Sequence, residues 1–379
     1  MKKIGILTIN DYDNYGNRLQ NYASQEVLKS LGFSVETVIH KTKKDMKTSS
    51  LEKMKNLKGL SVSEISKRFN NKWKKYLYNK KVKDIKPKRL RAFKEFTDTY
   101  ISETDYYITA EYIPDDLGNK YDYFVTGSDQ VWNPTFTDRR YSTIDFLTFA
   151  PKEKRISYAA SFGVSEIPNE FVEEYTGLIS GMNKISVREQ AGAEIVKKLT
   201  KKNATVLVDP TMMLTKDKWL SISKKPKTKL TRNKYLLTYF LGKQSKVNKK
   251  IINEIARKNN LEIINLADVE DKEAFITGPS EFIDFINSAS VFCTNSFHGV
   301  VFSILLETPF IVFPREGTVM SMNSRIDTLL STFNLQTRTI SNINTNEQVF
   351  EMDYTHTKSI LEKERKKAIN FLKDALQVD

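Results

Sequence analysis

The sequence of 379 residues predicts an α/β protein with two doubly wound, Rossmann-like domains that face a cleft. Three observations support this. Short apolar runs typical of strands alternate with amphipathic segments typical of helices. The alternation occurs twice, on either side of a stretch rich in Lys, Pro and Thr at 223–234. Polar clusters follow several of the strand-like runs, and doubly wound sheets bind ligands at the carboxyl ends of their strands.

The first half of the chain begins with a strand at 3–9, a helix at 15–31 and a strand at 33–39. Gly32 marks the end of the helix, since glycine is a common helix-stop residue. A basic segment follows, and the pattern then predicts a helix at 89–101, strands at 121–125 and 155–160, a helix at 169–179, a strand at 184–187, a helix at 189–199 and a strand at 205–208.

The second half repeats the alternation with a strand at 235–240, a helix at 246–258, a strand at 261–265, a helix at 280–287, a strand at 289–294, a helix at 298–306 and a strand at 310–313. Amphipathic helices are predicted at 325–333 and 357–376. We therefore expect an N-terminal domain at 1–222 on the acceptor side, a C-terminal domain at 223–354 with the donor or anion site, and a helix within 355–379 that packs back toward the N-terminal domain.

The net charge of +14 is concentrated in one segment. Residues 41–94 hold 20 Lys and Arg against four acidic residues, a net charge of +16, so the rest of the chain sums to −2. Apolar residues recur among the lysines at helical spacing. This pattern suits an amphipathic insertion that is solvated and packed on its own domain, or one that binds an anionic membrane surface through Lys41–Lys94. No nucleic-acid motif accompanies it, so we expect no nucleic-acid partner.

Other features of composition point to a cytoplasmic protein. The single cysteine, Cys293, excludes an intramolecular disulfide framework. The apolar stretch at 4–9 is too short for a signal peptide, and no run approaches the ~18 apolar residues of a membrane span. The basic segment adds the expectation of peripheral attachment at the inner face of the membrane.

The most informative motif is Thr294–Gly299, a small polar turn between an apolar strand and a helix. Helix N-termini bind anions, because their N–H groups are unpaired and carry partial positive charge. His298 lies at this position and is one of only three histidines, and histidine exchanges protons near neutral pH. The alternative is a core histidine in the first turn of its own helix.

Three further polar segments follow strands or begin helices. The loop 127–134 holds Asp129, Gln130 and Asn133, which can orient hydroxyls, and Trp132, which can stack on a sugar face. In the segment 14–20 a glycine permits close backbone approach. Arg188 follows a strand, and its guanidinium can grip a phosphate or carboxylate with two bonds. The alternatives are ordinary ones: Arg188 in a surface ion pair, Asp129 as a helix cap and Trp132 in the core.

Together these segments resemble the polysaccharide pyruvyl transferase family. The matching stretches are spread in order along the chain: NYGNRLQNYA at 14–23, GSDQVWNP at 127–134, SYAASFG at 157–163, SVRE at 186–189, VDPT at 208–211 and TNSFHG at 294–299. The resemblance implies a fold like that of the two-Rossmann (GT-B) glycosyltransferases. It also implies a role in bacterial exopolysaccharide assembly, with pyruvate moved from phosphoenolpyruvate to a sugar as a ketal.

The resemblance gives each candidate residue a role. Phosphoenolpyruvate is the expected co-substrate, with no other cofactor and no metal, and a glycan or lipid-linked oligosaccharide is the acceptor. The resemblance assigns His298 and Asp129 to catalysis, Arg188, Ser296, Gly299 and Arg325 to donor binding, and Asn14, Asn17, Arg18, Gln130, Trp132 and Asn133 to acceptor binding.

One position departs from the family pattern. Characterised members carry Arg two residues before the motif histidine, whereas this chain has Ser296. Arg188, Arg315 or Arg325 can supply the missing charge. The alternative is a GT-B-type glycosyltransferase that uses a nucleotide-sugar donor.

Overall fold

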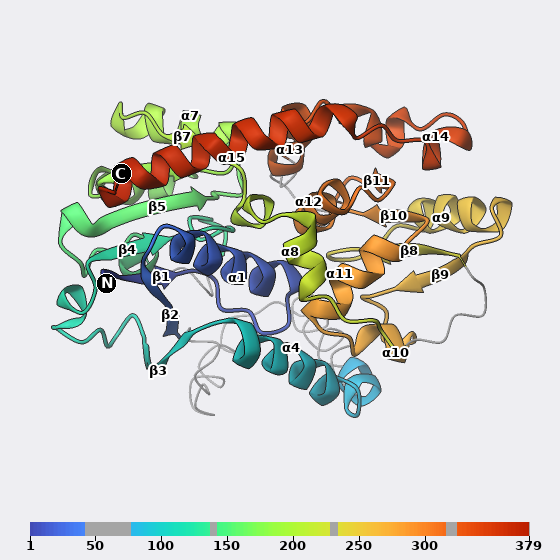
Figure 1. The fold of residues 1–379 in the computed structure, drawn as a ribbon, viewed down its shortest axis with the longest axis horizontal. Coiled ribbons are helices and arrows are strands. Elements are labelled where there is room, and N and C mark those ends of the chain that lie inside the picture. The colour runs from blue at the N-terminus through green and yellow to red at the C-terminus, as the bar shows by residue number, and fades with distance from the viewer. Residues whose placement is uncertain (42–76, 137–141, 228–233, 316–323, 379) are drawn as a thin grey trace, which may run out of the picture.

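A computed structural model of the protein describes residues 1–41, 77–136, 142–227, 234–315 and 324–378, and two parallel sheets organise them (Figure 1). The first has seven strands in the order β3-β2-β1-β4-β5-β6-β7. Their bounds are Lys3–Leu7 (β1), Ser34–His40 (β2), Glu103–Ile108 (β3), Tyr123–Thr126 (β4), Arg155–Ala160 (β5), Lys184–Val187 (β6) and Thr205–Val206 (β7).

Helices cover both faces of the first sheet. On one face, Ile4 and Ile6 of β1 share a core with Val27 of helix α1 (Tyr15–Ser30) and with Leu372 of the C-terminal helix α15 (Thr355–Leu376). The opposite face packs against α6 (Val172–Ser180) and α7 (Gln190–Thr200). Because a strand points successive side chains to opposite faces, the almost completely buried strands β1, β4 and β5 belong in a sheet covered on both sides.

The second sheet has four parallel strands in the order β11-β10-β8-β9. The strands are β8 (Tyr235–Tyr239), β9 (Glu262–Asn265), β10 (Val291–Thr294) and β11 (Phe310–Val312). One face packs on α11 (Pro279–Ser288) and α12 (Phe297–Leu306), the other on α9 (Lys246–Lys258) and α14 (Glu347–Phe350). The doubly wound, two-domain α/β fold predicted from the sequence is thus confirmed.

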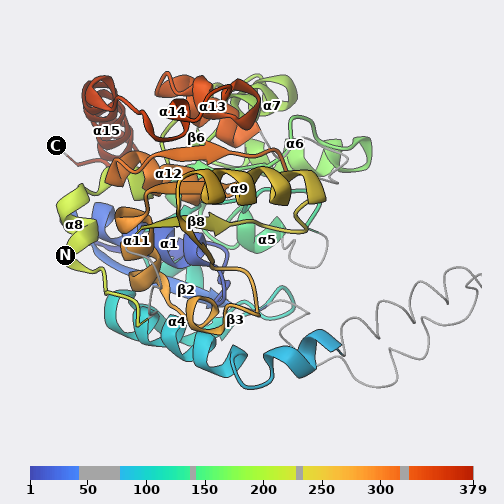
Figure 2. The ribbon, with the colours of Figure 1, turned by 90° about the vertical axis from the view of Figure 1, so that its right-hand side faces the viewer.

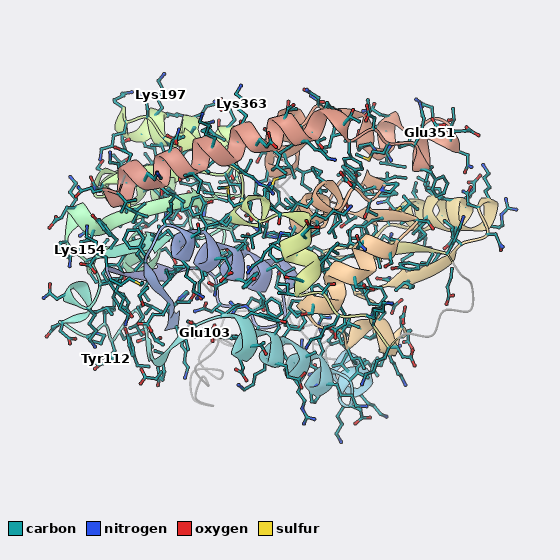
Figure 3. All side chains as sticks on the ribbon, in the orientation of Figure 1. Glu103, Tyr112, Lys154, Lys197, Glu351 and Lys363 are labelled. Atoms are coloured by element: carbon teal, nitrogen blue, oxygen red, sulfur yellow. The ribbon has the colours of Figure 1, made fainter. Side chains whose placement is uncertain are left out.

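Two helices join the domains. In Figure 1, α15 runs across both of them, and α4 (Lys86–Tyr100) extends below the first sheet toward α10 (Lys272–Phe275). Arg365 of α15 donates to the carbonyl oxygens of Met212 and Leu214 at 2.8 and 2.6 Å, where the chain leaves the first domain. Charged side chains such as Lys363 and Lys197 project from the outer helices (Figure 3).

Most predicted elements are present, with small shifts at their ends. The elements that the sequence did not predict are four short helices (Ser142–Asp145, Lys216–Ser221, α10 and α14) and the strand β3. Its polar sequence, ETDYYI, lacks a continuous apolar run because it is an edge strand paired only with β2. The remaining helices are α5 (Ser142–Asp145), α8 (Lys216–Ser221) and α13 (Ser324–Thr332).

The basic segment lies mostly outside the described residues, which resume at 77. Where the structure describes it, the segment runs beside the second domain (Figure 2). Val82 and Ile85 pack against Phe275. Within the described ranges, no helix is long and apolar enough to cross a membrane.

Candidate active site

The two sheets bring their ligand-binding edges to one place. In the first sheet the strand order reverses between β1 and β4, and in the second between β8 and β10. Such switch points are where doubly wound sheets bind ligands. The α1 N-terminus follows β1, Asp129 follows β4, and His298 follows β10. The candidate site is therefore shared between both switch points.

A buried chain of ion pairs forms the floor of this site on the first domain. Arg188, after β6, donates from NH1 to Asp209 Oδ2 at 2.7 Å and from NH2 to Asp129 Oδ1 at 3.3 Å. Asn17 of α1 donates to the other Asp129 oxygen. Asp209 is fixed further by Ser128, whose hydroxyl lies 2.8 Å from its Oδ2. Each carboxylate therefore has at least two donors in place.

The imidazole of His298 comes from the second domain and rests on the first. Its Nε2 lies 3.6 Å from Asp209 Oδ2. A Cβ built on Gly16 would stand 2.1 Å from His298 Nδ1. Only glycine lets the backbone of α1 approach the ring so closely. The site is thus complete only when both domains meet.

Charge holds the two carboxylates ionised. Burial alone would raise the pKa of Asp129, but the charges of Arg188, His298 and Arg325 outweigh it and lower that pKa. Burial acts on Asp209 in the same way, and there His298 and Arg188 lower the pKa far below its usual range. The same carboxylates raise the pKa of Arg188 despite its burial. Neither carboxylate is therefore suited to accept a proton near neutral pH.

Arg325 differs from Arg188 because, within the described residues, no ion pair joins it to a carboxylate, although the charges of Asp129 and Glu189 act on it. It is 7% exposed, and its Nε has no hydrogen-bond partner. Burial, reinforced by the nearby charge of Arg188, lowers the pKa of Arg325 to about 10. Both arginines line a cavity of about 30 Å³ together with Asp209 and Phe297. A buried cation without a partner is costly, so this cavity is suited to an anionic group.

The N-terminus of α12 borders the same cavity. Ser296 caps the helix by accepting from the Gly299 N–H at 3.3 Å. Gly299 packs closely on β10, where a Cβ would stand 2.9 Å from Thr294 Oγ1. The ring of Phe297 lies 4.1 Å from the guanidinium carbon of Arg188, a cation–π contact across the two domains.

The predicted acceptor residues occupy different environments. Asn14 caps α1 by accepting from the Asn17 N–H at 3.2 Å. The Asn133 amide donates to Gln130 Oε1 at 2.9 Å, and the Asn133 oxygen accepts from Thr135. Of this set, Asn17 makes a direct hydrogen bond to a predicted catalytic residue.

Two of these residues do not fit the role predicted for them. Trp132 is fully buried and stacked on Phe146 at 4.8 Å, so neither face of its ring is open to a sugar. Arg18 is also fully buried, and it donates to Glu103 at 2.9 Å and stacks on Tyr12. Both side chains pack in the interior of the first domain. An aromatic or cationic side chain in a polar segment can be part of a core as readily as part of a binding site.

Two residues that meet at the centre of the site, Asp209 and Ser128, were not predicted as site residues from the sequence. Asp209 follows β7 and precedes a proline within VDPT, and its position after a strand was the available signal. Ser128 had no comparable signal. Among the described residues, no group of three or more His, Cys, Asp or Glu side chains is placed to hold a metal ion.

Comparison with known proteins gives one family and several similar folds. The family model for polysaccharide pyruvyl transferase matches residues 14–317. No curated protein matches the chain. A putative UDP-N-acetylglucosamine 2-epimerase from Listeria monocytogenes is 13% identical, with 97% of this chain and 91% of that one covered and a TM-score of 0.46. S. aureus MnaA in a structure with UDP is 12% identical, with 100% of this chain and 98% of that one covered and a TM-score of 0.49. Anabaena HepE in complex with UDP and glucose is 8% identical, with 99% of this chain and 100% of that one covered and a TM-score of 0.44.

Proposed function

This chain belongs to the polysaccharide pyruvyl transferase family, and we propose that it moves pyruvate from phosphoenolpyruvate to two hydroxyls of a sugar, forming a ketal. The acceptor is a polymeric glycan or a lipid-linked oligosaccharide of the bacterial cell surface. The observation that carries the proposal is the buried Arg325, which lines one cavity with Arg188 and forms no ion pair within the described residues.

The donor suits this arrangement of charge. Phosphoenolpyruvate carries a phosphate and a carboxylate, and both need cationic partners. Arg188 is already bound to two carboxylates, which leaves its Nε without a partner. Arg325 forms no ion pair with a described carboxylate, although the charges of Asp129 and Glu189 act on it. Arg325 therefore takes over the anion binding that the family assigns to the position of Ser296.

The reaction needs one proton delivered and two removed. Protonation of the methylene carbon makes the adjacent enol carbon electrophilic, and a sugar hydroxyl attacks that carbon and gives up its proton. The bond from this carbon to the phosphate oxygen then breaks. The second hydroxyl closes the ketal, and its proton leaves with the phosphate.

His298 is the proposed proton donor and acceptor. Its Nε2 lies 3.6 Å from Asp209 Oδ2, and histidine exchanges protons near neutral pH. Asp129 has a lowered pKa and bonds to Arg188 and Asn17, so we assign it to orienting groups rather than to removing a proton.

One observation favours a second function. Ser296 stands where the characterised family members have an arginine, so the donor-binding motif is incomplete. A nucleotide-sugar glycosyltransferase with the same fold is the alternative. The two functions differ in what leaves: phosphate from phosphoenolpyruvate, or a nucleotide from the sugar donor.

An assay of phosphate release tests the proposal. Purified enzyme is incubated with phosphoenolpyruvate and a panel of glycan acceptors, and a parallel series uses nucleotide sugars. We expect phosphate release that depends on the acceptor, and a loss of roughly 10²-fold or more in turnover in the His298→Ala variant. Acceptor-dependent nucleotide release, without phosphate from phosphoenolpyruvate, would establish the alternative.

A further inference from the structure

The first residue of α1 inserts its side chain into the opposite domain. Tyr15 is fully buried, and its ring stacks on Phe282 of the second domain with centroids 4.4 Å apart and an angle of 13°. Its hydroxyl donates to the carbonyl oxygen of Thr277 at 3.2 Å. The beginning of α1 is therefore attached to the second domain, although the rest of the helix covers the first sheet.

Arg89 of α4 holds this tyrosine from the other side. Its NH1 group donates to the Tyr15 hydroxyl and to the carbonyl oxygen of Phe275, both at 2.7 Å. Its Nε donates to Asp13 Oδ1 at 2.5 Å, and NH2 donates to the Asp13 carbonyl oxygen at 3.2 Å. Arg89 is 4% exposed. We call Asp13, Tyr15, Arg89, Phe275 and Thr277 the interdomain clamp.

The two residues that follow Tyr15 both contact the candidate active site. Gly16 lies directly against the imidazole of His298, and Asn17 bonds to Asp129. A helical turn is stiff, since its residues share one set of backbone hydrogen bonds. The clamp therefore determines where the backbone of Gly16 meets His298.

We propose that Arg89 and Tyr15 are positioning residues, which hold the first turn of α1 against the second domain and thereby set the place of the His298 imidazole. The inference rests on the acid–base role proposed for His298. Arg89 and Tyr15 touch neither donor nor acceptor in this scheme. They act through Gly16, whose missing side chain lets the ring rest on the helix.

The test weakens the clamp by two conservative substitutions. Tyr15→Phe keeps the stacked ring but loses the hydroxyl contacts to Thr277 and Arg89. Arg89→Lys keeps the charge but cannot bond to Asp13, Tyr15 and Phe275 at once. The matched control is Tyr235→Phe, which loses one buried hydroxyl contact, to the Phe285 carbonyl oxygen at 2.7 Å, away from the clamp.

Imidazole NMR spectra provide a readout that needs no turnover. The chain has three histidines, so the His298 signals are identified by their absence in His298→Gln. We expect these signals and their pH titration to change in Tyr15→Phe and Arg89→Lys, and to stay as in the wild type in Tyr235→Phe. The kcat of Tyr15→Phe should fall about tenfold, because the His298 imidazole would no longer be held in its reacting position, and the KM for phosphoenolpyruvate should stay nearly unchanged.

Unchanged His298 signals and wild-type kcat in Tyr15→Phe would overturn the positioning role. An equal change in Tyr235→Phe would overturn it as well, because any buried contact would then have the same effect. If the wild type does not use phosphoenolpyruvate but the His298 signals still respond to the clamp variants, the proposed function fails and the positioning effect stands. If Arg89→Lys does not fold, Tyr15→Phe decides.

Discussion

The two buried arginines of the site differ in their ion pairs. Arg188 joins two buried carboxylates, so its charge is matched on both sides. Arg325 lines a cavity with Arg188, Asp209 and Glu364, but no ion pair joins it to a carboxylate among the described residues. Removing one member of a buried ion pair leaves an uncompensated charge, whereas removing an unpaired buried charge relieves a cost. Replacing Arg188 should therefore lower stability, whereas replacing Arg325 should weaken anion binding without lowering stability.

Replacement of each arginine by Met tests this contrast. Arg188→Met should lower the free energy of unfolding by about 3–5 kcal/mol, because Asp129 and Asp209 lose their shared partner. Arg325→Met should unfold at or above the wild-type temperature and bind phosphoenolpyruvate at least about tenfold more weakly. Calorimetric unfolding and titration with the donor measure both. Equal destabilisation by the two variants would contradict the account.

The lowered pKa of Asp209 predicts a dependence of stability on pH. In the unfolded chain this carboxyl has a pKa near ~3.9, and in the folded protein the pKa is lower, so below that value the unfolded state binds more protons. The contribution of Asp209 is present above pH ~4 and is lost as the pH falls toward the folded pKa. Unfolding of Asp209→Asn compared with the wild type at pH 6 and pH 3 should show a difference that shrinks at the lower pH. A constant difference would refute this.

Single residues were the hardest to predict. His298, Arg188 and Asp129 were predicted because polar or charged side chains stood out after strands, and Arg325 was predicted as a replacement for the arginine missing at Ser296. The same rule selected Trp132, whose ring satisfies the core instead. Sequence shows residue type and position, but it does not show which way a side chain points. Asp209 lies in the site because β7, which precedes it, pairs with β6, which precedes Arg188. Local sequence patterns do not reveal such a pairing between strands.

At the scale of elements, the first turn of α1 is the part that both domains share. Gly16→Ala should reduce turnover at least about tenfold, because the new Cβ displaces the His298 ring. The fold should persist, since Ala favours helices by ~1 kcal/mol over Gly. Gly177→Ala in α6 is the control, because nothing lies within 4 Å of its Cβ. Full activity of Gly16→Ala in steady-state assays would show that the close approach is not needed.

Helices and buried strands were predictable because their periodicity is local. The apolar runs of β1, β4 and β10 and the amphipathic pattern of α9 fixed these elements within a few residues. The edge strand β3 was not predicted because it has a neighbouring strand on one side alone, β2, and its sequence therefore lacks a continuous apolar run. The sequence predicted doubly wound sheets but not the order of their strands, because strand pairing depends on contacts between distant parts of the chain.

For the whole molecule, the segment 41–94 carries the basic excess, and most of it lies outside the described residues. Peripheral membrane attachment through this segment stays a prediction. The full chain should co-sediment with phosphatidylglycerol vesicles at low salt and dissociate at high salt, since surface charges are screened over ~8 Å at physiological ionic strength. A variant with six lysines of 43–75 replaced by Gln is the control. Absence of binding at low salt would remove the membrane prediction.

The central claim is that one site shared by two domains transfers pyruvate from phosphoenolpyruvate to a sugar. The most direct measurement follows phosphoenolpyruvate labelled with ¹³C in its enol carbon during incubation with enzyme and a glycan acceptor. The account predicts that the label appears in the glycan as a ketal carbon, in step with phosphate release, and that Arg325→Met and His298→Ala abolish both. A glycan that stays unlabelled with phosphoenolpyruvate but gains a sugar from a nucleotide donor would contradict it.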